Sequence, residues 1–254
     1  QLLERIQSQI GQNVLKKVPV ENEEYHLRVK QKAEAMGVYY EASKIGVDNL
    51  IQGYWDDIEM LDANEVNIIK EKIAIGNAKI DSVRARLVRD GNFYVIIFNF
   101  GLYIYLNKNL KLLYASQHPE DVIYCNRLEK NQYSSKIFRE YRDELCQIYK
   151  GARRVMGAMI LLKPEATLVA FQLYFIELFI LCHELGHFFS GDLEDENQTM
   201  TLSDNSDSKI LSENNSQNIE LDADIKGFQL VLRILIKKNE LGKISFNPQL
   251  ILNT

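Results

Sequence analysis

The chain has 254 residues, of which 46% are hydrophobic and 10% aromatic, with only four prolines. This composition is typical of a globular protein with a substantial core and argues against long disordered tracts. Acidic residues outnumber basic ones by 35 to 30, which gives a net charge of −5. Because no basic stripe is visible either, we expect no nucleic-acid partner.

The cysteines indicate the cellular compartment. Cys125, Cys146 and Cys182 are odd in number and have no C-x-x-C spacing, so neither a disulfide framework nor a cysteine zinc site is expected. Reduced thiols fit a cytoplasmic protein. The first twenty residues also lack the continuous apolar segment of a signal peptide.

In chain order, the first expected region is helical and covers residues 1–75, where apolar positions recur with helical periodicity. Residues 76–254 are predicted to form the functional region, with a single domain overall as the alternative. Within that region, alternating residues between 82 and 99 surround Asp90-Gly91. This pattern predicts a β-hairpin whose second strand is the more buried one.

The remaining elements are expected to be mainly helical. A helix is predicted from Leu102 to Tyr114, one or two charged surface helices between 119 and 150, and a long apolar helix from Glu165 to Ser190. Residues 191–216, rich in Asp, Glu, Asn and Ser, are expected to form a mobile loop before an amphipathic helix from Gln217 to Lys238. The predicted fold class is therefore α+β, mostly helical, with a small antiparallel hairpin or sheet.

The apolar helix requires a test against a membrane span. Residues 166–181 are nearly all apolar, interrupted by Gln172 and Glu177. A spanning helix needs about 20 apolar residues. We therefore favour a buried core helix, with an interfacial or membrane-spanning helix as the alternative.

The sequence His183-Glu184-Leu185-Gly186-His187 has the spacing H-E-x-x-H. Because one helical turn takes about 3.6 residues, the two histidines project from one helix face and can bind a single zinc ion. Glu184 can take a proton from the water that attacks a peptide carbonyl. Gly186 lies where a small residue allows close packing. The alternative interpretation is a pair of histidines capping the exposed end of a core helix.

A third zinc ligand has to come from elsewhere. In three-histidine enzymes it follows six residues after the second histidine, but that position is Leu193, and no histidine occurs after His187. A carboxylate is therefore expected. Asp192, Glu194 and Glu196 are candidates, although a flexible loop is a poor place for a metal ligand.

The segment N-I-E-L-D-A-D-I-K-G-F offers a better carboxylate. Glu220 and Asp224 are four residues apart and share one helix face. Glu220 could complete a tetrahedral zinc site and leave the fourth position to water. Asp224 could then accept the free N–H of a ligand histidine, with His183 as the first candidate.

H-E-L-G-H followed by E-L-D-A-D resembles the gluzincins, the thermolysin-like zinc metallopeptidases, and especially their small bacterial and phage-borne members. The resemblance implies a zincin-like catalytic region with Zn²⁺ as cofactor and Glu184 as the base. The zinc ligands it implies are His183, His187 and Glu220, with Asp224 in a supporting role. It also implies an edge strand that binds the substrate backbone, for which Phe93–Phe98 is the candidate.

The predicted function is a zinc-dependent endopeptidase acting on a protein or peptide, with a narrow protein substrate suggested by analogy to small intracellular proteases. One alternative is a catalytically silent zinc-binding regulatory module. The other is a membrane-associated metalloprotease that uses residues 166–181 as an anchor. No oxyanion-stabilising residue is assigned, since the spare histidines His26 and His118 compete with thirteen tyrosines.

Overall fold

A computed structural model describes most of the chain after residue 46. The described ranges are 47–78, 82–118, 122–126, 129–131, 135–150, 158–161, 165–193 and 213–243. Of the expected helical N-terminal region, residues 1–46 therefore lie outside the described residues. So do residues 194–212 of the expected loop.

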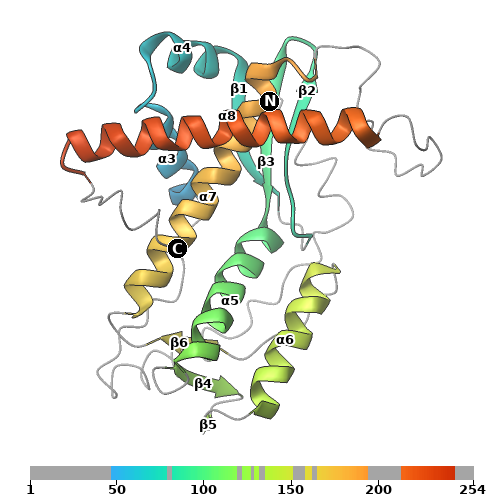
Figure 1. Ribbon diagram of the computed structural model, residues 1–254, viewed down its shortest axis with the longest axis vertical. Helices are drawn as coiled ribbons and strands as arrows, with labels where there is room; N and C mark the ends of the chain where they lie inside the picture. Colours follow the sequence, from blue (N-terminus) through green and yellow to red (C-terminus); the bar gives the residue numbers. More distant parts are fainter. Residues whose placement is uncertain are drawn as a thin grey trace. The chain divides into compact units, whose positions relative to one another are not determined.

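The described residues form six helices and two three-stranded sheets, which confirms an α+β, mostly helical fold (Figure 1). The helices are α3 (Val47–Ile58), α4 (Ala63–Lys72), α5 (Phe100–Gln117), α6 (Ser135–Tyr149), α7 (Glu165–Ser190) and α8 (Glu213–Glu240). The strands are β1 (Ile73–Ala78), β2 (Ala85–Asp90), β3 (Phe93–Asn99), β4 (Val122–Asn126), β5 (Glu129–Asn131) and β6 (Ala158–Leu161).

The chain divides into two compact units, each built from several separate stretches of the sequence. Within the described ranges, the first unit contains residues 77–85 and 97–176. The second contains residues 48–76 and 86–96 together with the chain from Glu177 onward. The predicted boundary at residue 75 stays a prediction.

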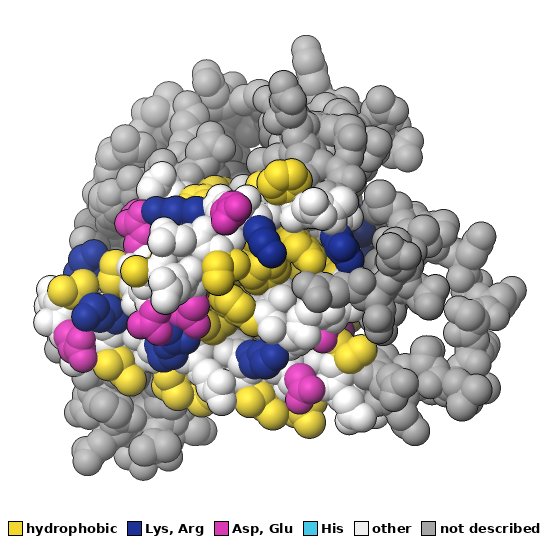
Figure 2. All heavy atoms as spheres, turned by 90° about the horizontal axis from the view of Figure 1, so that it is seen from above, with side chains coloured by type: hydrophobic (Ala, Val, Ile, Leu, Met, Phe, Trp, Pro, Cys, Tyr) yellow, Lys and Arg dark blue, Asp and Glu magenta, His cyan; other side chains and the backbone are white. Residues whose placement is uncertain are grey.

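Charges of both signs are mixed on the face drawn in Figure 2. Lys and Arg side chains are dispersed among Asp and Glu side chains, and apolar side chains are exposed between them. Several apolar residues of α8 are exposed to solvent, among them Leu221, Ile225 and Phe228. The basic side chains on this face do not gather into a stripe.

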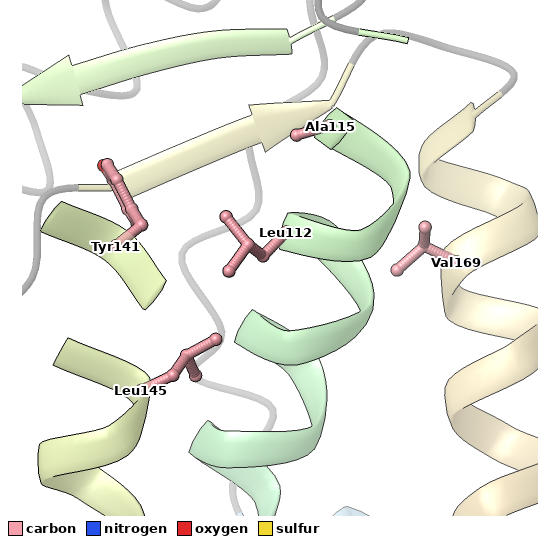
Figure 3. Packing of buried hydrophobic residues seen from close by; sticks show 5 residues of the cluster. All are labelled: Leu112, Ala115, Tyr141, Leu145 and Val169. Atoms are coloured by element: carbon pink, nitrogen blue, oxygen red, sulfur yellow. The ribbon is translucent and has the colours of Figure 1, made fainter. Parts of the chain in front are cut away.

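In the first unit, a small apolar cluster joins three helices (Figure 3). Leu112 and Ala115 come from α5, Tyr141 and Leu145 from α6, and Val169 from the first half of α7. All five are buried. The burial of these side chains stabilises the unit by removing apolar surface from water.

The prediction of only helices between residues 119 and 150 was wrong for its first half. Strand β4 pairs antiparallel with β5, placing Tyr124 opposite Asn131, and with β6, placing Val122 opposite Leu161. Of the residues described between 119 and 150, those of α6 are the helical ones. Strand β4 is stabilised by pairing with β6, more than thirty residues farther along the chain. Local periodicity does not reveal such a distant pairing, so the sequence does not indicate the strand.

The other sheet has the strand order β1-β3-β2. The hairpin β2–β3 is confirmed, with Gly91 in its turn at φ 64°. The assignment of Phe93–Phe98 as the edge strand was wrong, because β3 lies in the centre and is buried at every position except Phe93. A continuous apolar run of this kind is typical of a strand covered on both faces. Among the described strands of this sheet, the edges are β1, of which only residues 73–75 were predicted as helix, and β2.

Helix α7 has the predicted bounds, whereas α8 begins at Glu213, four residues before the predicted start. Leu178, Leu181 and Leu185 of α7 are fully buried, so its second half is a core helix. Of the described helices, only α7 is long and apolar enough over Thr167–Ser190 to cross a membrane, and 39% of its most apolar 18-residue stretch is buried inside the protein.

Candidate metal centre

Helices α7 and α8 cross in the second unit with their backbones in close contact (Figure 1). A Cβ atom on Gly186 would lie 2.6 Å from the carbonyl oxygen of Ala223, and one on Gly227 would lie 2.9 Å from Cα of His183. No side chain larger than hydrogen fits at either position. The glycines of H-E-L-G-H and A-D-x-x-G therefore set the distance between the helix that carries the histidines and the helix that carries Glu220.

This crossing brings together the three residues that the sequence predicts as ligands. Nε2 of His183 lies 3.1 Å from Nε2 of His187. Oε2 of Glu220 lies 3.3 Å from Nε2 of His183 and 3.7 Å from Nε2 of His187. The three side chains could together hold a metal ion.

Two carboxylates hold the outer nitrogens of the imidazoles. Nδ1 of His183 lies 2.8 Å from Oδ1 of Asp224, the contact expected from the sequence. Nδ1 of His187 lies 2.9 Å from Oδ2 of Asp192. Asp192 is a rival ligand by its position in the sequence, but its oxygen contacts the outer nitrogen of His187 rather than the inner one.

These contacts fix the protonation pattern of neutral imidazoles. When Nδ1 donates its hydrogen to a carboxylate, Nε2 carries a lone pair. The lone pairs of His183 and His187 then point at each other and at the carboxylate oxygen of Glu220. Such a group of acceptors is mutually repulsive without a cation between its members. The donor set therefore fits a bound metal ion.

Glu184 lies on α7 beside the ligands and is 7% exposed. Burial raises the pKa of this carboxyl to about 7, and the negative charge of Glu220 adds to the increase. The imidazole of His183 and a hydrogen bond from the backbone N–H of Leu87 oppose it. A buried carboxyl with a pKa near neutrality is suited to both accepting and donating a proton.

The other described residues singled out in the sequence do not belong to the ligand cluster. Glu177 and Cys182 are buried in α7, and Cys182 is a free thiol. His118 stacks on Tyr114 at the end of α5 in the first unit. Glu194, Glu196 and His26 lie outside the described residues.

Two contacts of the site were not foreseen from the sequence: Asp192 on His187, and the Leu87 backbone on Glu184. The first had a detectable signal. Gly191 ends α7 at φ 73°, and after a helix-ending glycine of this kind the next N–H bonds back to a carbonyl of the last helical turn, as that of Asp192 does to His187. The backbone contact leaves no trace in the sequence.

The chain matches no protein-family model, no curated protein and no solved structure. The functional argument therefore depends on the geometry of the cluster formed by His183, His187 and Glu220, and on its immediate surroundings.

Proposed function

We propose that this chain is a zinc-dependent peptidase of the gluzincin type, with a zincin-like catalytic region. The single observation that carries the proposal is the convergence of the inner nitrogens of His183 and His187 on the Glu220 carboxylate. Both outer nitrogens are held by carboxylates. This arrangement of imidazoles backed by carboxylates is characteristic of zinc sites.

The distances fit a tetrahedral zinc ion. Zinc bonds to nitrogen and oxygen of about 2.0–2.1 Å in a tetrahedron place neighbouring ligand atoms about 3.3–3.4 Å apart. The corresponding separations here are 3.1, 3.3 and 3.7 Å. Two histidines and one carboxylate are also a ligand set that catalytic zinc sites use while keeping a fourth position open.

The chemistry of peptide hydrolysis is divided between the metal and Glu184. Zinc, when bound, polarises the peptide carbonyl and lowers the pKa of water to about 7. Glu184 accepts a proton from the attacking water and then donates it to the leaving amine nitrogen. The backbone N–H of Leu87 holds the Glu184 carboxylate in place for both transfers.

Strand β2 is the candidate for holding the substrate backbone. It is an edge of its sheet, unlike β3, and its residue Leu87 contacts Glu184. An extended peptide added to this edge would place a backbone carbonyl near the base. We therefore propose a protein or peptide substrate, and by analogy with small intracellular proteases a narrow one, in the cytoplasm.

The test combines metal analysis with hydrolysis. We expect the purified chain to contain one zinc ion, and His183→Ala and Glu220→Ala to lose it. Glu184→Gln should keep the zinc and lower cleavage of a peptide library, followed by mass spectrometry, by about 10²–10⁴-fold. Wild-type protein without stoichiometric zinc would contradict the metal site. Bound zinc with cleavage absent in the wild type would favour a regulatory zinc-binding module. Cleavage that Glu184→Gln leaves unchanged would contradict the role of Glu184 as the base.

A second candidate is a membrane-associated metalloprotease. It is favoured by α7, whose segment Thr167–Ser190 is long and apolar enough to span a bilayer. Fractionation of cells distinguishes the two proposals. A chain that stays in the membrane pellet after high-salt and carbonate washes would support the membrane-associated form, and release into the supernatant would contradict it.

A further inference from the structure

One strand contacts both the general base and the turn that follows the second histidine. Leu87 of β2 donates its backbone N–H to Glu184. Two residues along the same strand, Arg89 donates from Nη1 to the carbonyl oxygen of Leu193 at 2.8 Å. The second nitrogen of its fork, Nε, donates to the carbonyl oxygen of Gly91 at 2.9 Å. Arg89 thereby links the hairpin turn to the turn after α7.

The turn after α7 is well defined by its own contacts. Gly191 adopts φ 73° and donates its N–H to the carbonyl of Phe188 at 3.2 Å. The N–H of Asp192 lies 3.3 Å from the carbonyl oxygen of His187. The turn therefore brings the side chain of Asp192 back onto the histidine five residues before it.

Asp192 is the better protected of the two carboxylates that hold the histidines. Its side chain is 14% exposed, whereas that of Asp224 is 52% exposed. Asp224 is held by the regular backbone of α8, but Asp192 lies just beyond the end of a helix. Residues beyond a helix end have fewer hydrogen bonds than those inside it, so contacts from other segments add to those of the turn itself in holding their position.

We infer that Arg89 is a positioning residue for the metal centre: by holding the Leu193 carbonyl it keeps Asp192 on Nδ1 of His187. The inference rests on the proposed metal site. Loss of the guanidinium releases the turn, and an imidazole without its partner rotates more freely. Partners of metal-binding histidines typically contribute 10–100-fold to metal affinity. Arg89 acts on His187 only through Asp192, so its loss should lower metal affinity by a smaller factor than the loss of Asp192 itself.

The experiment measures zinc affinity and the zinc dissociation rate of the full-length chain with a chromophoric chelator. The variants are Arg89→Ala, Arg89→Lys, Asp192→Ala, Asp192→Asn and the double variant with alanine at both positions. Arg142→Ala is the matched control, because Arg142 pairs with its neighbour Asp143 on α6 in the other unit. Thermal unfolding of the chelated proteins shows whether each variant folds like the wild type.

We expect Asp192→Ala to bind zinc about 10–100-fold more weakly and Asp192→Asn to fall between it and the wild type, because the amide oxygen still accepts a hydrogen bond. Arg89→Ala should weaken binding by about threefold to tenfold, a fraction of that factor, mainly through faster dissociation. Arg89→Lys should restore part of the loss. In the Asp192→Ala background, Arg89→Ala should have no further effect, since Arg89 acts through Asp192.

The outcomes separate this inference from the proposed function. If the wild type binds no zinc, both fall. If it binds zinc and Arg89→Ala matches the wild type or Arg142→Ala, the positioning role of Arg89 alone is overturned. Effects of Arg89→Ala and Asp192→Ala that multiply would also overturn it, because they would show that the residues act independently. If Arg89→Ala fails to fold, Arg89→Lys decides.

Discussion

Replacing Gly227 by alanine tests whether the close helix crossing builds the metal centre. A Cβ at this position would lie 2.9 Å from both N and Cα of His183 and 3.1 Å from the carbonyl carbon of Cys182. All three are backbone atoms of a core helix, so no side chain can move aside. Ordinary carbon contacts are about 3.5–4.0 Å. The helices must therefore separate by more than about half an ångström.

The size of the effect follows from two opposing contributions. Alanine in a helix interior is favoured over glycine by about 0.5–1 kcal/mol, and overpacking of a tight interior costs about 1–3 kcal/mol. We expect Gly227→Ala to lower the free energy of unfolding by about 1–2 kcal/mol. Zinc affinity should fall by at least about tenfold, because Glu220 moves with α8 away from the histidines on α7.

Gly53→Ala is the matched control. Gly53 lies inside α3, and a Cβ there would meet no atom within 4 Å. It should raise the free energy of unfolding by about 0.5–1 kcal/mol and leave zinc binding unchanged. Urea denaturation of the metal-free proteins and zinc titration provide the two measurements. A Gly227→Ala protein that is more stable than the wild type and binds zinc equally well would refute the argument from the crossing.

Three further predictions concern stability. Burial raises the pKa of Glu177 from 4.5 to about 7, so the wild type should lose stability as pH rises from about 4.5 to 7. Glu177→Gln should be more stable than the wild type by up to about 3 kcal/mol at pH 8 and equally stable at pH 4. A difference in urea denaturation that does not change with pH would contradict this prediction. Arg233 of α8 pairs with Glu65 through two hydrogen bonds, at 2.9 and 2.6 Å, and also with Asp62. Arg233→Lys should cost about 0.5–1 kcal/mol in the same assay. A Glu65→Gln background should reduce that loss without abolishing it, because Asp62 still pairs with Arg233, and an undiminished loss would contradict the role of the Glu65 pair. At a free zinc concentration of 1,000 Kd, bound zinc should stabilise the folded protein by about 4 kcal/mol. Removing the zinc with a chelator should therefore lower the thermal midpoint, and an unchanged midpoint would contradict coupling of metal binding to folding.

The sequence predicts correctly those parts of the fold whose signal lies in a short, continuous segment of the chain. Helix α7 and the hairpin around Gly91 each carry their own signal, as an apolar run and as a turn dipeptide. The sequence does not indicate strands β1, β4 and β6, because each is short and depends on a partner strand elsewhere. Short apolar segments have no period that distinguishes strand from helix until the partner is known.

The candidate site shows the same division between local and distant signals. His183 and His187 share a face because of helical geometry alone, and Glu220 and Asp224 do so for the same reason. That the two faces meet is indicated by the small residues on each helix, Gly186 on α7 and Gly227 on α8. The spacing E-x-x-A-D-x-x-G therefore describes a helix surface shaped for contact as well as a set of ligands.

The contact of Arg89 with Leu193 has no such signal, since the two residues are 104 positions apart and the acceptor is a backbone carbonyl. Any residue at position 193 would present the same oxygen, so the amino-acid identity there carries no information about the contact. Arg89 is an exposed arginine of β2, where contact with solvent is the ordinary expectation. Only the folded arrangement of the turn after α7 distinguishes Arg89 from other surface arginines, and for this reason its role must be tested together with Asp192 rather than inferred from its charge.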